Sequence, residues 1–451
     1  MEAEATQLLA GFASKLTYDD IPERIRERCK DLLLDALACA IAGHLGEETP
    51  QVSPFAAALG QSRESTVIAG DRLSLAGATL LNGYLVTAVT MCDVHRATAT
   101  HVTPEVVPAA LAIAEREGAS GRDLLVALAA GLEVTTRIGA GIDFPAFRSR
   151  GWHGPGILGP FGAAAAVGRL LGLSPEGMAA AFGLAGSQAA GTYAAWGTPT
   201  VKFHQCRGAL SGLMAGLLAQ QGFVATRQFL TAPDGGLFAT YNGGGHPEKV
   251  TAALGERWEL EQIALRLWPS SAAPQGMLTA LFELLERHDL RAEQVRRLRV
   301  SLSKATSEMH GMFPTFHGKF EAMLSAHYIA AVTLHDRRLW LDQFEPARYN
   351  DPRLRRFAAE QVEILPDAAL SGAQAVVEVE TADGEKLVAR CEVAKGSPEN
   401  PLTREEIAGK LRNGALRILP TSQTEAIIEA VAHLEDLGST RKLMEHLSRP
   451  S

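Results

Sequence analysis

The sequence predicts a mainly α protein with a large all-helical domain and a smaller α+β domain. Three observations lead to this fold class. Apolar residues recur at helical spacing through the first two-thirds of the chain, β-like patterns are confined to the stretch from about residue 295 to residue 393, and a helix-capping signal follows at Thr403. The length of 451 residues favours two domains, because a common domain has roughly 150.

Helices dominate the first 265 residues. Asp20 is the expected N-cap of a helix that starts after Pro22, and apolar side chains then recur every three or four residues as far as Gly43. Three further helix starts combine a Ser or Thr with a following Pro or a capping-box acid, namely Thr103, Ser120 and Ser174. Runs of Gly and Ala at residues 162–168 and 208–212 put small side chains on helix faces, so we expect neighbouring helices to pack closely.

Two uncharged segments, residues 73–92 and 177–201, are long enough to be weighed as membrane spans. Both contain Gly, Ser, Thr, Asn or Gln throughout, and neither has strongly basic flanks. Helices that are apolar on all sides also occur inside large soluble proteins. We therefore expect buried helices and no contact with a membrane.

Composition narrows the class of partner and the compartment. The formal net charge of −8 lacks the positive field of a general nucleic-acid binder. The five cysteines are widely spaced and form no CxxC pair, which argues against disulfides and against a zinc or iron–sulfur site. The acidic N-terminus lacks a secretory signal. A cytoplasmic protein without a bound metal or other cofactor fits these features best.

Strand signals mark the smaller domain. Four segments are β-like, at residues 295–303, 361–365, 375–380 and 386–393. The last two flank a hairpin signal at Asp383-Gly384. A Gly- and Pro-rich break follows, and Thr403 with Glu406 then forms a capping box for a return to helix through residues 422–447. We expect an all-helical domain of residues 1–265, completed by residues 403–451, and an α+β domain of residues 266–402.

Ionisable side chains gather where the two uncharged segments end. The first segment leads into Asp93, His95 and His101, and the second ends at Lys202 and His204. Groups at the ends of buried helices are partly removed from water, which shifts their pKa values toward useful acid and base strength. These residues form a candidate site, and the alternative is that they are helix ends that simply surface into water.

Together with His153 in a Gly-rich turn, these clusters resemble the MmgE/PrpD family. The resemblance covers nearly the whole chain and rests on the order and spacing of many short stretches. They include Asp93-Val94-His95-Arg96 with His101, Ser120-Gly121-Arg122-Asp123, Gly151-Trp152-His153, Lys202-Phe203-His204, Glu321-Ala322 with Ser325 and Tyr328, and Asn400-Pro401-Leu402.

The resemblance implies a homodimer, a lid formed by the smaller domain, and metal-free, cofactor-free chemistry on a small polycarboxylate at the domain boundary. It assigns the active site to His101, His153, Lys202 and Tyr328, with Asp93 as one acid of the family's motif. In the segment that crosses between the domains, Arg266 replaces a Lys of the family and Gln275 replaces a His. We expect both residues, with His95 and His204, to bind substrate.

Enzymes of this family remove a proton or CO₂ from carbon next to a carboxylate. In that mechanism His101 or His153 is the general base, Lys202 and Arg266 bind carboxylates, and Tyr328 donates a proton. A dehydratase similar to 2-methylcitrate dehydratase is the first expectation. An epimerase of an iminodisuccinate-like substrate and a cis-aconitate-type decarboxylase are the alternatives, and a polycarboxylate-binding protein without turnover is a further one.

Overall fold

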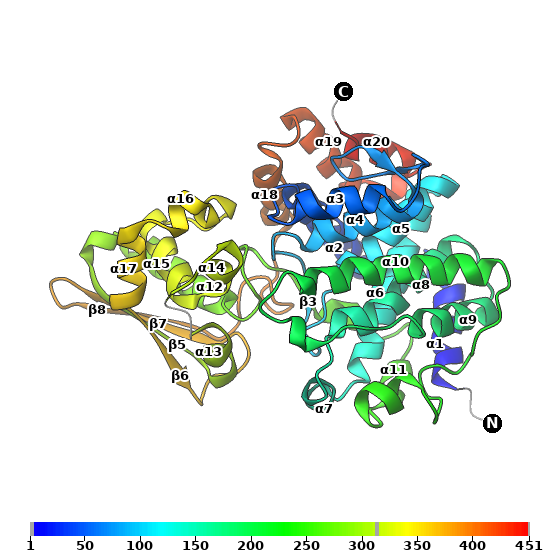
Figure 1. The fold of residues 1–451 in the computed structure, drawn as a ribbon, viewed down its shortest axis with the longest axis horizontal. Coiled ribbons are helices and arrows are strands. Elements are labelled where there is room, and N and C mark those ends of the chain that lie inside the picture. The colour runs from blue at the N-terminus through cyan, green and yellow to red at the C-terminus, as the bar shows by residue number, and fades with distance from the viewer. Residues whose placement is uncertain (1–3, 312–314, 450–451) are drawn as a thin grey trace. The chain divides into compact units, whose positions relative to one another are not determined.

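The computed structural model describes residues 4–311 and 315–449, which form two compact units (Figure 1). The helical domain comprises the chain up to Ala264 together with the chain from Thr403 onward, and the α+β domain comprises Leu265–Leu402. The first boundary falls one residue earlier than the expected position. The structure is mainly α, as the sequence predicts.

The helical domain is built from long helices and short helical turns. Its α-helices are α1 (Ala5–Lys15), α2 (Glu23–Gly43), α3 (Thr49–Ala57), α4 (Leu75–Thr87), α5 (Thr103–Glu117), α6 (Gly121–Ala140), α7 (Phe144–Ser149), α8 (Gly154–Leu170), α9 (Pro175–Gly186), α10 (Thr200–Gln220), α11 (Pro247–Thr251), α18 (Arg404–Ala415), α19 (Thr421–Ala432) and α20 (Arg441–Leu447). Its shorter turns are η1 (Tyr193–Ala195), η2 (Phe238–Asn242), η3 (Glu259–Gln262) and η6 (Leu434–Asp436).

Helix α8 lies at the core of the helical domain and packs against α5, α6, α9 and α10 (Figure 1). Glycines allow this close contact, as the Gly-rich runs predict. A Cβ atom on Gly162 would lie 1.9 Å from Thr135 Oγ1, and one on Gly212 would lie 2.3 Å from Ala163 Cβ. Because such contacts are shorter than van der Waals separation, these positions of the packed helices require glycine.

The predicted helix caps are confirmed in three places and wrong in one. Ser120 and Thr403 form capping boxes, and the Ser174 side chain accepts a hydrogen bond from the backbone N–H of Gly177. Asp20 does not cap α2, because its carboxylate binds the backbone N–H and hydroxyl of Thr17, and Pro22 occupies the N-cap position.

Two uncharged segments lead to different structures. The first contains α4, which is buried along most of its length. In the second, α9 ends at Gly186, the short turn η1 follows, and α10 begins at Thr200. Gly191 and Gly197 in the intervening stretch have positive φ angles, which interrupt a continuous helix. Within residues 4–311 and 315–449, no helix is long and apolar enough to cross a bilayer.

Short ribbons interrupt the helical domain, which is therefore not purely helical. Strands β1 (Ser65–Thr66) and β2 (Arg72–Leu73) pair with each other, and β3 (Val94–His95) pairs antiparallel with β4 (Ile263–Ala264). The β3–β4 ribbon therefore pairs the segment that carries Asp93 and His95 with Ile263–Ala264, where the first part of the helical domain ends.

The C-terminal helices rejoin the N-terminal ones. Helix α18 packs on α2, where the Lys410 ammonium forms an ion pair with Asp35 and also bonds the Met91 carbonyl oxygen at 3.3 Å. The expected helix over residues 422–447 is wrong in detail, because α19 ends at Ala432 and η6 separates it from α20.

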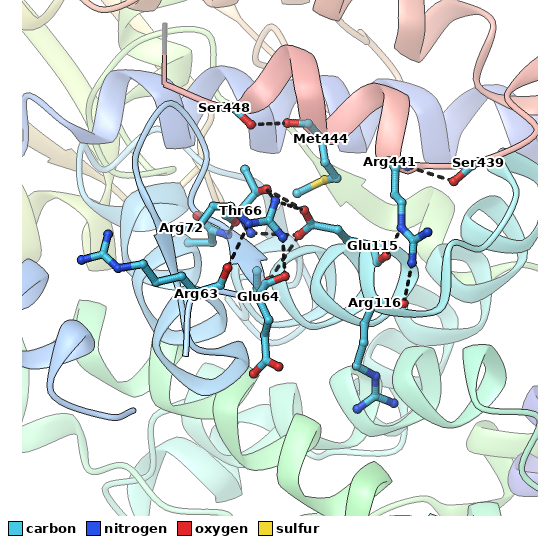
Figure 2. Close-up of polar contacts among 12 residues, drawn as sticks. Arg63, Glu64, Thr66, Arg72, Glu115, Arg116, Ser439, Arg441, Met444 and Ser448 are labelled. Carbon is cyan, nitrogen blue, oxygen red and sulfur yellow. Dashed lines mark hydrogen bonds and ion pairs between the residues drawn. The ribbon is translucent and has the colours of Figure 1, made fainter. Parts of the chain in front are cut away.

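A polar network fastens α20 to α5 and to the β1–β2 ribbon (Figure 2). The Arg441 guanidinium donates to the carbonyl oxygens of Glu115 and Arg116, each at 3.0 Å. The buried Glu115 carboxylate accepts hydrogen bonds from Thr66 and pairs with Arg72 at 2.8 Å. Residues from three distant parts of the chain therefore share one network, which closes the domain.

The α+β domain places helices against one mixed sheet. Its strands are β5 (Val295–Ser303), β6 (Val362–Asp367), β7 (Ala375–Thr381) and β8 (Lys386–Cys391), in the order β6-β5-β7-β8. Strands β5 and β6 are parallel, with Leu298 opposite Val362, and the other pairs are antiparallel, which confirms the predicted hairpin.

Along β7 and β8, buried side chains alternate with more exposed ones, so one face of each strand packs against the core. Helices α12 (Gln275–His288), α15 (Ala326–Asp336) and α17 (Pro352–Glu360) supply much of the apolar surface that covers it. The remaining helical pieces are η4 (Ala292–Gln294), α13 (Lys304–His310), α14 (Lys319–Leu324), η5 (Leu341–Phe344) and α16 (Pro346–Tyr349).

The Lys410–Asp35 pair yields a stability prediction. Lys410→Met removes one charge from a pair whose side chains are 1% and 0% exposed, and so leaves a buried carboxylate without its cation. We expect a loss of about 3–5 kcal/mol in the free energy of unfolding, measured by urea denaturation. The matched control is Arg24→Ala, which breaks an exposed ion pair with Glu261 and should cost about 0–1 kcal/mol. Equal losses in the two variants would contradict the prediction.

Candidate active site

The segment between α4 and α5 carries the first predicted cluster, and Asp93 organises it. The fully buried Asp93 carboxylate accepts hydrogen bonds from the backbone N–H of Val102 (2.9 Å) and of Thr103 (3.0 Å), and from the Thr103 hydroxyl. Burial raises the pKa of this carboxyl, and the hydrogen bonds offset part of the rise. Asp93 therefore caps α5 and positions the loop before it, and its expected catalytic role stays a prediction.

His101 lies directly before α5 with a defined tautomer. Its Nδ1 is 2.5 Å from the carbonyl oxygen of Asp93 and 3.7 Å from Cys92 Sγ. A carbonyl oxygen can only accept, so Nδ1 donates the proton of this hydrogen bond. In the neutral imidazole the lone pair is then on Nε2, which is the form that a general base requires.

His153 and His204 meet from different helices. His153 is the N-cap of α8, His204 lies in the first turns of α10, and their Nδ1 atoms are 2.9 Å apart. One ring must donate and the other accept, so two imidazolium rings cannot face each other in this geometry. The structure therefore joins two predicted site residues into a pair that shares one proton between its Nδ1 atoms.

Burial keeps this histidine pair neutral. Burial, with smaller contributions from the nearby His204 and Arg148, lowers the pKa of His153 to about 3. Burial and Arg207 also lower the pKa of His204. Both rings are therefore uncharged at neutral pH, able to accept a proton only when a strong acid or a substrate charge favours it.

Lys202, two residues before His204 on α10, is buried and paired with an acid from the N-terminal region. Its Nζ lies 2.7 Å from Glu48 Oε2, and the same oxygen accepts a hydrogen bond from the Tyr84 hydroxyl at 2.9 Å. Burial and Glu48 raise the pKa of Tyr84, so the phenol keeps its proton. The ammonium is thus held in a fixed position, as a carboxylate-binding cation must be.

An aromatic stack lies beside His153. The Arg148 guanidinium carbon is 3.1 Å from the centroid of the Tyr193 ring, and Tyr193 stacks on Trp196 with ring centroids 5.4 Å apart. Tyr193 also meets His153 edge to face, at 6.1 Å between centroids. The stack places the Arg148 cation next to the histidine pair, and the rings of Tyr193 and Trp196 add flat apolar surface there.

His95 makes hydrogen bonds that connect two segments of the helical domain. It is fully buried, and its Nδ1 and Nε2 lie 3.1 Å from Thr98 Oγ1 and 3.3 Å from Glu259 Oε1. Glu259 is itself held by its backbone N–H, which donates to Glu133 at 3.0 Å. His95 therefore ties the loop to η3, and its expected role in substrate binding stays a prediction.

The expected site residues of the α+β domain have structural partners inside that domain. The Gln275 amide bonds the backbone of Trp268 and the Ser270 hydroxyl, and the buried Arg266 donates to the Ser270 carbonyl oxygen at 3.0 Å. Tyr328 is fully buried among Phe316 and Phe344, and its hydroxyl donates to a backbone carbonyl oxygen. Burial also raises the pKa of Tyr328, so the phenol keeps its proton at neutral pH. Its expected role as proton donor stays a prediction.

Close backbone contacts hold the parts of the candidate active site together. A Cβ atom on Gly154, next to His153, would lie 2.3 Å from Thr100 Oγ1, and one on Gly156 would lie 3.3 Å from His204 Cβ. The loop that ends at His101 therefore packs on the start of α8, and α8 packs on α10. We define the candidate active site as five residues of the helical domain, His101, Arg148, His153, Lys202 and His204.

Sequence reasoning missed Glu48, Tyr84 and Arg148. Glu48 and Lys202 are 154 positions apart, and no local pattern links them. Among the residues that the structure describes, no group of three or more His, Cys, Asp or Glu side chains is arranged to hold a metal ion.

The low pKa of His153 predicts an acid-dependent loss of stability. An unfolded histidine has a pKa near 6.5, so below that pH the unfolded chain binds a proton at this position. The folded chain binds that proton only near pH 3. Stability due to the neutral ring is therefore present above pH 6.5 and falls as the pH falls. Between pH 7 and 5.5 the wild type should lose about 1 kcal/mol more than His153→Gln, measured by urea unfolding at both pH values. The same loss in both proteins would show that His153 is protonated in the folded state.

Comparison with known proteins identifies the family. The MmgE/PrpD N-terminal domain matches residues 7–249, and the MmgE/PrpD C-terminal domain matches residues 268–436. The chain is 31% identical over 480 residues to a cis-aconitate decarboxylase-like protein, oryM, of Aspergillus oryzae, covering 99% of this chain and 98% of that protein. It is 30% identical to a cis-aconitate decarboxylase of Aspergillus terreus (99% and 96% covered) and 26% identical to that of Homo sapiens (99% and 95% covered). Matches to both domains and similarity along almost the whole length show that the chain belongs to the MmgE/PrpD family.

Proposed function

We propose that the protein is a lyase that decarboxylates cis-aconitate or a closely similar unsaturated tricarboxylate. The observation that carries this proposal is the end-to-end similarity to a cis-aconitate decarboxylase-like protein, at 31% identity, and to a cis-aconitate decarboxylase, at 30% identity. The candidate active site supports it, because two cations and three histidines lie in one domain, where they can bind carboxylates and transfer a proton. A 2-methylcitrate dehydratase, the first expectation from sequence, has no comparable support.

The reaction requires groups that bind the substrate's carboxylates and a group that supplies one proton. The C–C bond to a carboxylate breaks, CO₂ leaves, and the electron pair remains on carbon, where the neighbouring C=C bond and carboxylate delocalise it. A proton then bonds to carbon, so the net change is loss of CO₂ and uptake of one H⁺. Fixed cations lower the barrier by holding the remaining carboxylates and by stabilising the carbanion.

Lys202 and Arg148 are the cations for the substrate. An ammonium has three N–H donors, so Lys202 can bind Glu48 and a substrate carboxylate at the same time. Arg148, fixed on the face of Tyr193, offers a planar guanidinium that suits a carboxylate. His101, with its proton on Nδ1, uses Nε2 to take up a proton and deliver it to the carbanion.

The reaction itself can be read by proton NMR in D₂O. With cis-aconitate we expect release of CO₂ and a dicarboxylate product that carries one solvent deuterium on carbon. Formation of an alkene from 2-methylcitrate without CO₂ release would instead identify a dehydratase, and exchange with inversion of a substrate C–H would identify an epimerase. Binding of these acids without any reaction would identify a polycarboxylate-binding protein without turnover. The family resemblance also supports a homodimer, which sedimentation velocity tests directly.

Two variants separate proton transfer from carboxylate binding. His101→Asn should lower kcat by about 10²–10⁴ with little change in KM, because it removes the proton carrier. Lys202→Met should raise KM by roughly 10- to 100-fold, because a hydrogen bond to a charged group contributes about 1.5–3 kcal/mol. His433→Ala, at an exposed histidine outside the site, is the control and should behave as wild type. Wild-type kinetics in both site variants would refute the site.

A further inference from the structure

Large apolar side chains gather on one exposed part of the helical domain. Among the residues that the structure describes, eleven large apolar side chains are exposed, and seven of these lie on α3, on α10 or just after these helices. We call the seven the α3–α10 face, and they are Phe55, Leu59, Phe203, Met214, Leu218, Phe223 and Val224. Single exposed apolar side chains are common on soluble proteins, but a group of this size marks an interaction surface.

Helical spacing and packing bring these side chains together. On α10, exposed and half-buried side chains recur every three or four residues and so share one side of the helix, at Phe203, Arg207, Leu210, Met214, Leu217 and Leu218. Helices α3 and α10 both pack on α4, and Figure 1 shows them on either side of it. Their N-terminal ends are also joined, because Glu48 is the N-cap of α3 and pairs with Lys202 in the first turn of α10.

The α3–α10 face is almost without charge. Helix α3 contains no charged residue, and α10 contains no acid. Lys202 of α10 is buried, and Arg207 directs its guanidinium to the carbonyl oxygens of Gln188 and Ala190, each at 2.6 Å. The basic side chains of α10 are therefore occupied by partners inside the helical domain, and the side that faces solvent is mainly apolar.

An uncharged face suits a second copy of the same chain. In a two-fold dimer each face meets its own copy, so a charged face would repel its partner and an uncharged face does not. The cores of such interfaces are poor in charge and rich in aromatic side chains and Met, which describes this face. A membrane surface fits less well, because helices that bind there carry Lys and Arg beside their apolar side.

The exposed area is close to what a stable dimer requires. At about 200 Å² for a fully exposed large apolar residue, the exposed fractions of the seven side chains, 37% to 90%, amount to roughly 700 Å² per copy. A standard interface buries about 800 Å² per partner. The half-buried Leu210 and Leu217 on the same side of α10 add to the area that a partner can cover.

We propose that a second copy of the chain docks on the α3–α10 face, and that this contact holds the Lys202–Glu48 pair in place. Phe203 of the face directly follows Lys202, and the Glu48 side chain is still 17% exposed in the single chain. Docking fixes the two helix ends that carry the pair and removes water from it. The second part of the proposal rests on the proposed function, in which Lys202 binds a substrate carboxylate.

The double variant Met214→Asp, Leu218→Asp tests both parts, because it places two carboxylates in the face of each copy. By sedimentation velocity we expect the wild type to be a dimer and the double variant a monomer, since burying unpaired like charges is unfavourable. The KM for the tricarboxylate should rise roughly 3- to 30-fold in the double variant, as expected for coupled groups. The matched control is Leu416→Asp, at an exposed leucine just after α18, which should remain a dimer with the wild-type KM.

A monomeric wild type, or a double variant that remains a dimer, would overturn the docking surface. Separation into monomers with an unchanged KM would overturn the link to the Lys202–Glu48 pair. Circular dichroism checks that the variants fold, and Val224→Asp, at a side chain that is 90% exposed, replaces the double variant if that one does not.

Two further outcomes are separate from these. Binding of a monomeric wild type to vesicles of anionic phospholipid would identify a membrane surface as the occupant and so contradict the proposal. A wild type that is a dimer through this face but releases no CO₂ from any tested tricarboxylate would contradict the proposed function, while the docking surface would stand.

Discussion

Close packing of α5, α8 and α10 is the constraint on which the rest of the helical domain depends. Glycines at the contacts allow backbones to approach to distances that a methyl group would prevent. As a result, the N-terminal ends of three helices converge, and with them His101, His153 and His204. Partial positive charge at helix N-termini favours anions there. The same packing that makes the core dense thus creates a region suited to a polycarboxylate.

Burial then determines the protonation states within this region. The histidine pair is neutral because two charged rings cannot share one short contact, and because desolvation disfavours the imidazolium form. Lys202 is held by Glu48, whereas Asp93 uses its carboxylate to cap α5. Cations and neutral bases therefore occupy separate positions in the helical domain, an arrangement that suits proton transfer next to a carboxylate.

Local patterns predicted much of the architecture. The capping boxes at Ser120 and Thr403 and the β7–β8 hairpin follow from residues adjacent in sequence. Predictions failed where a contact from elsewhere competed. The Asp20 carboxylate bonds Thr17 and does not cap the helix that follows it, and the second uncharged segment is divided between α9, η1 and α10. The roles of Tyr328 and Gln275 at the site stay predictions from the resemblance, since the structure shows only that both side chains make hydrogen bonds within their own domain.

The sequence by itself determined the fold class, the family resemblance and the identity of His101, His153, Lys202 and His204 as candidates, because periodicity, caps and short motifs are local properties. Only the tertiary structure decided that His153 pairs with His204 and that Lys202 pairs with Glu48. Those features depend on which side chains meet across many intervening residues and on how much water the packing excludes. Neither quantity is encoded in any short stretch of the chain.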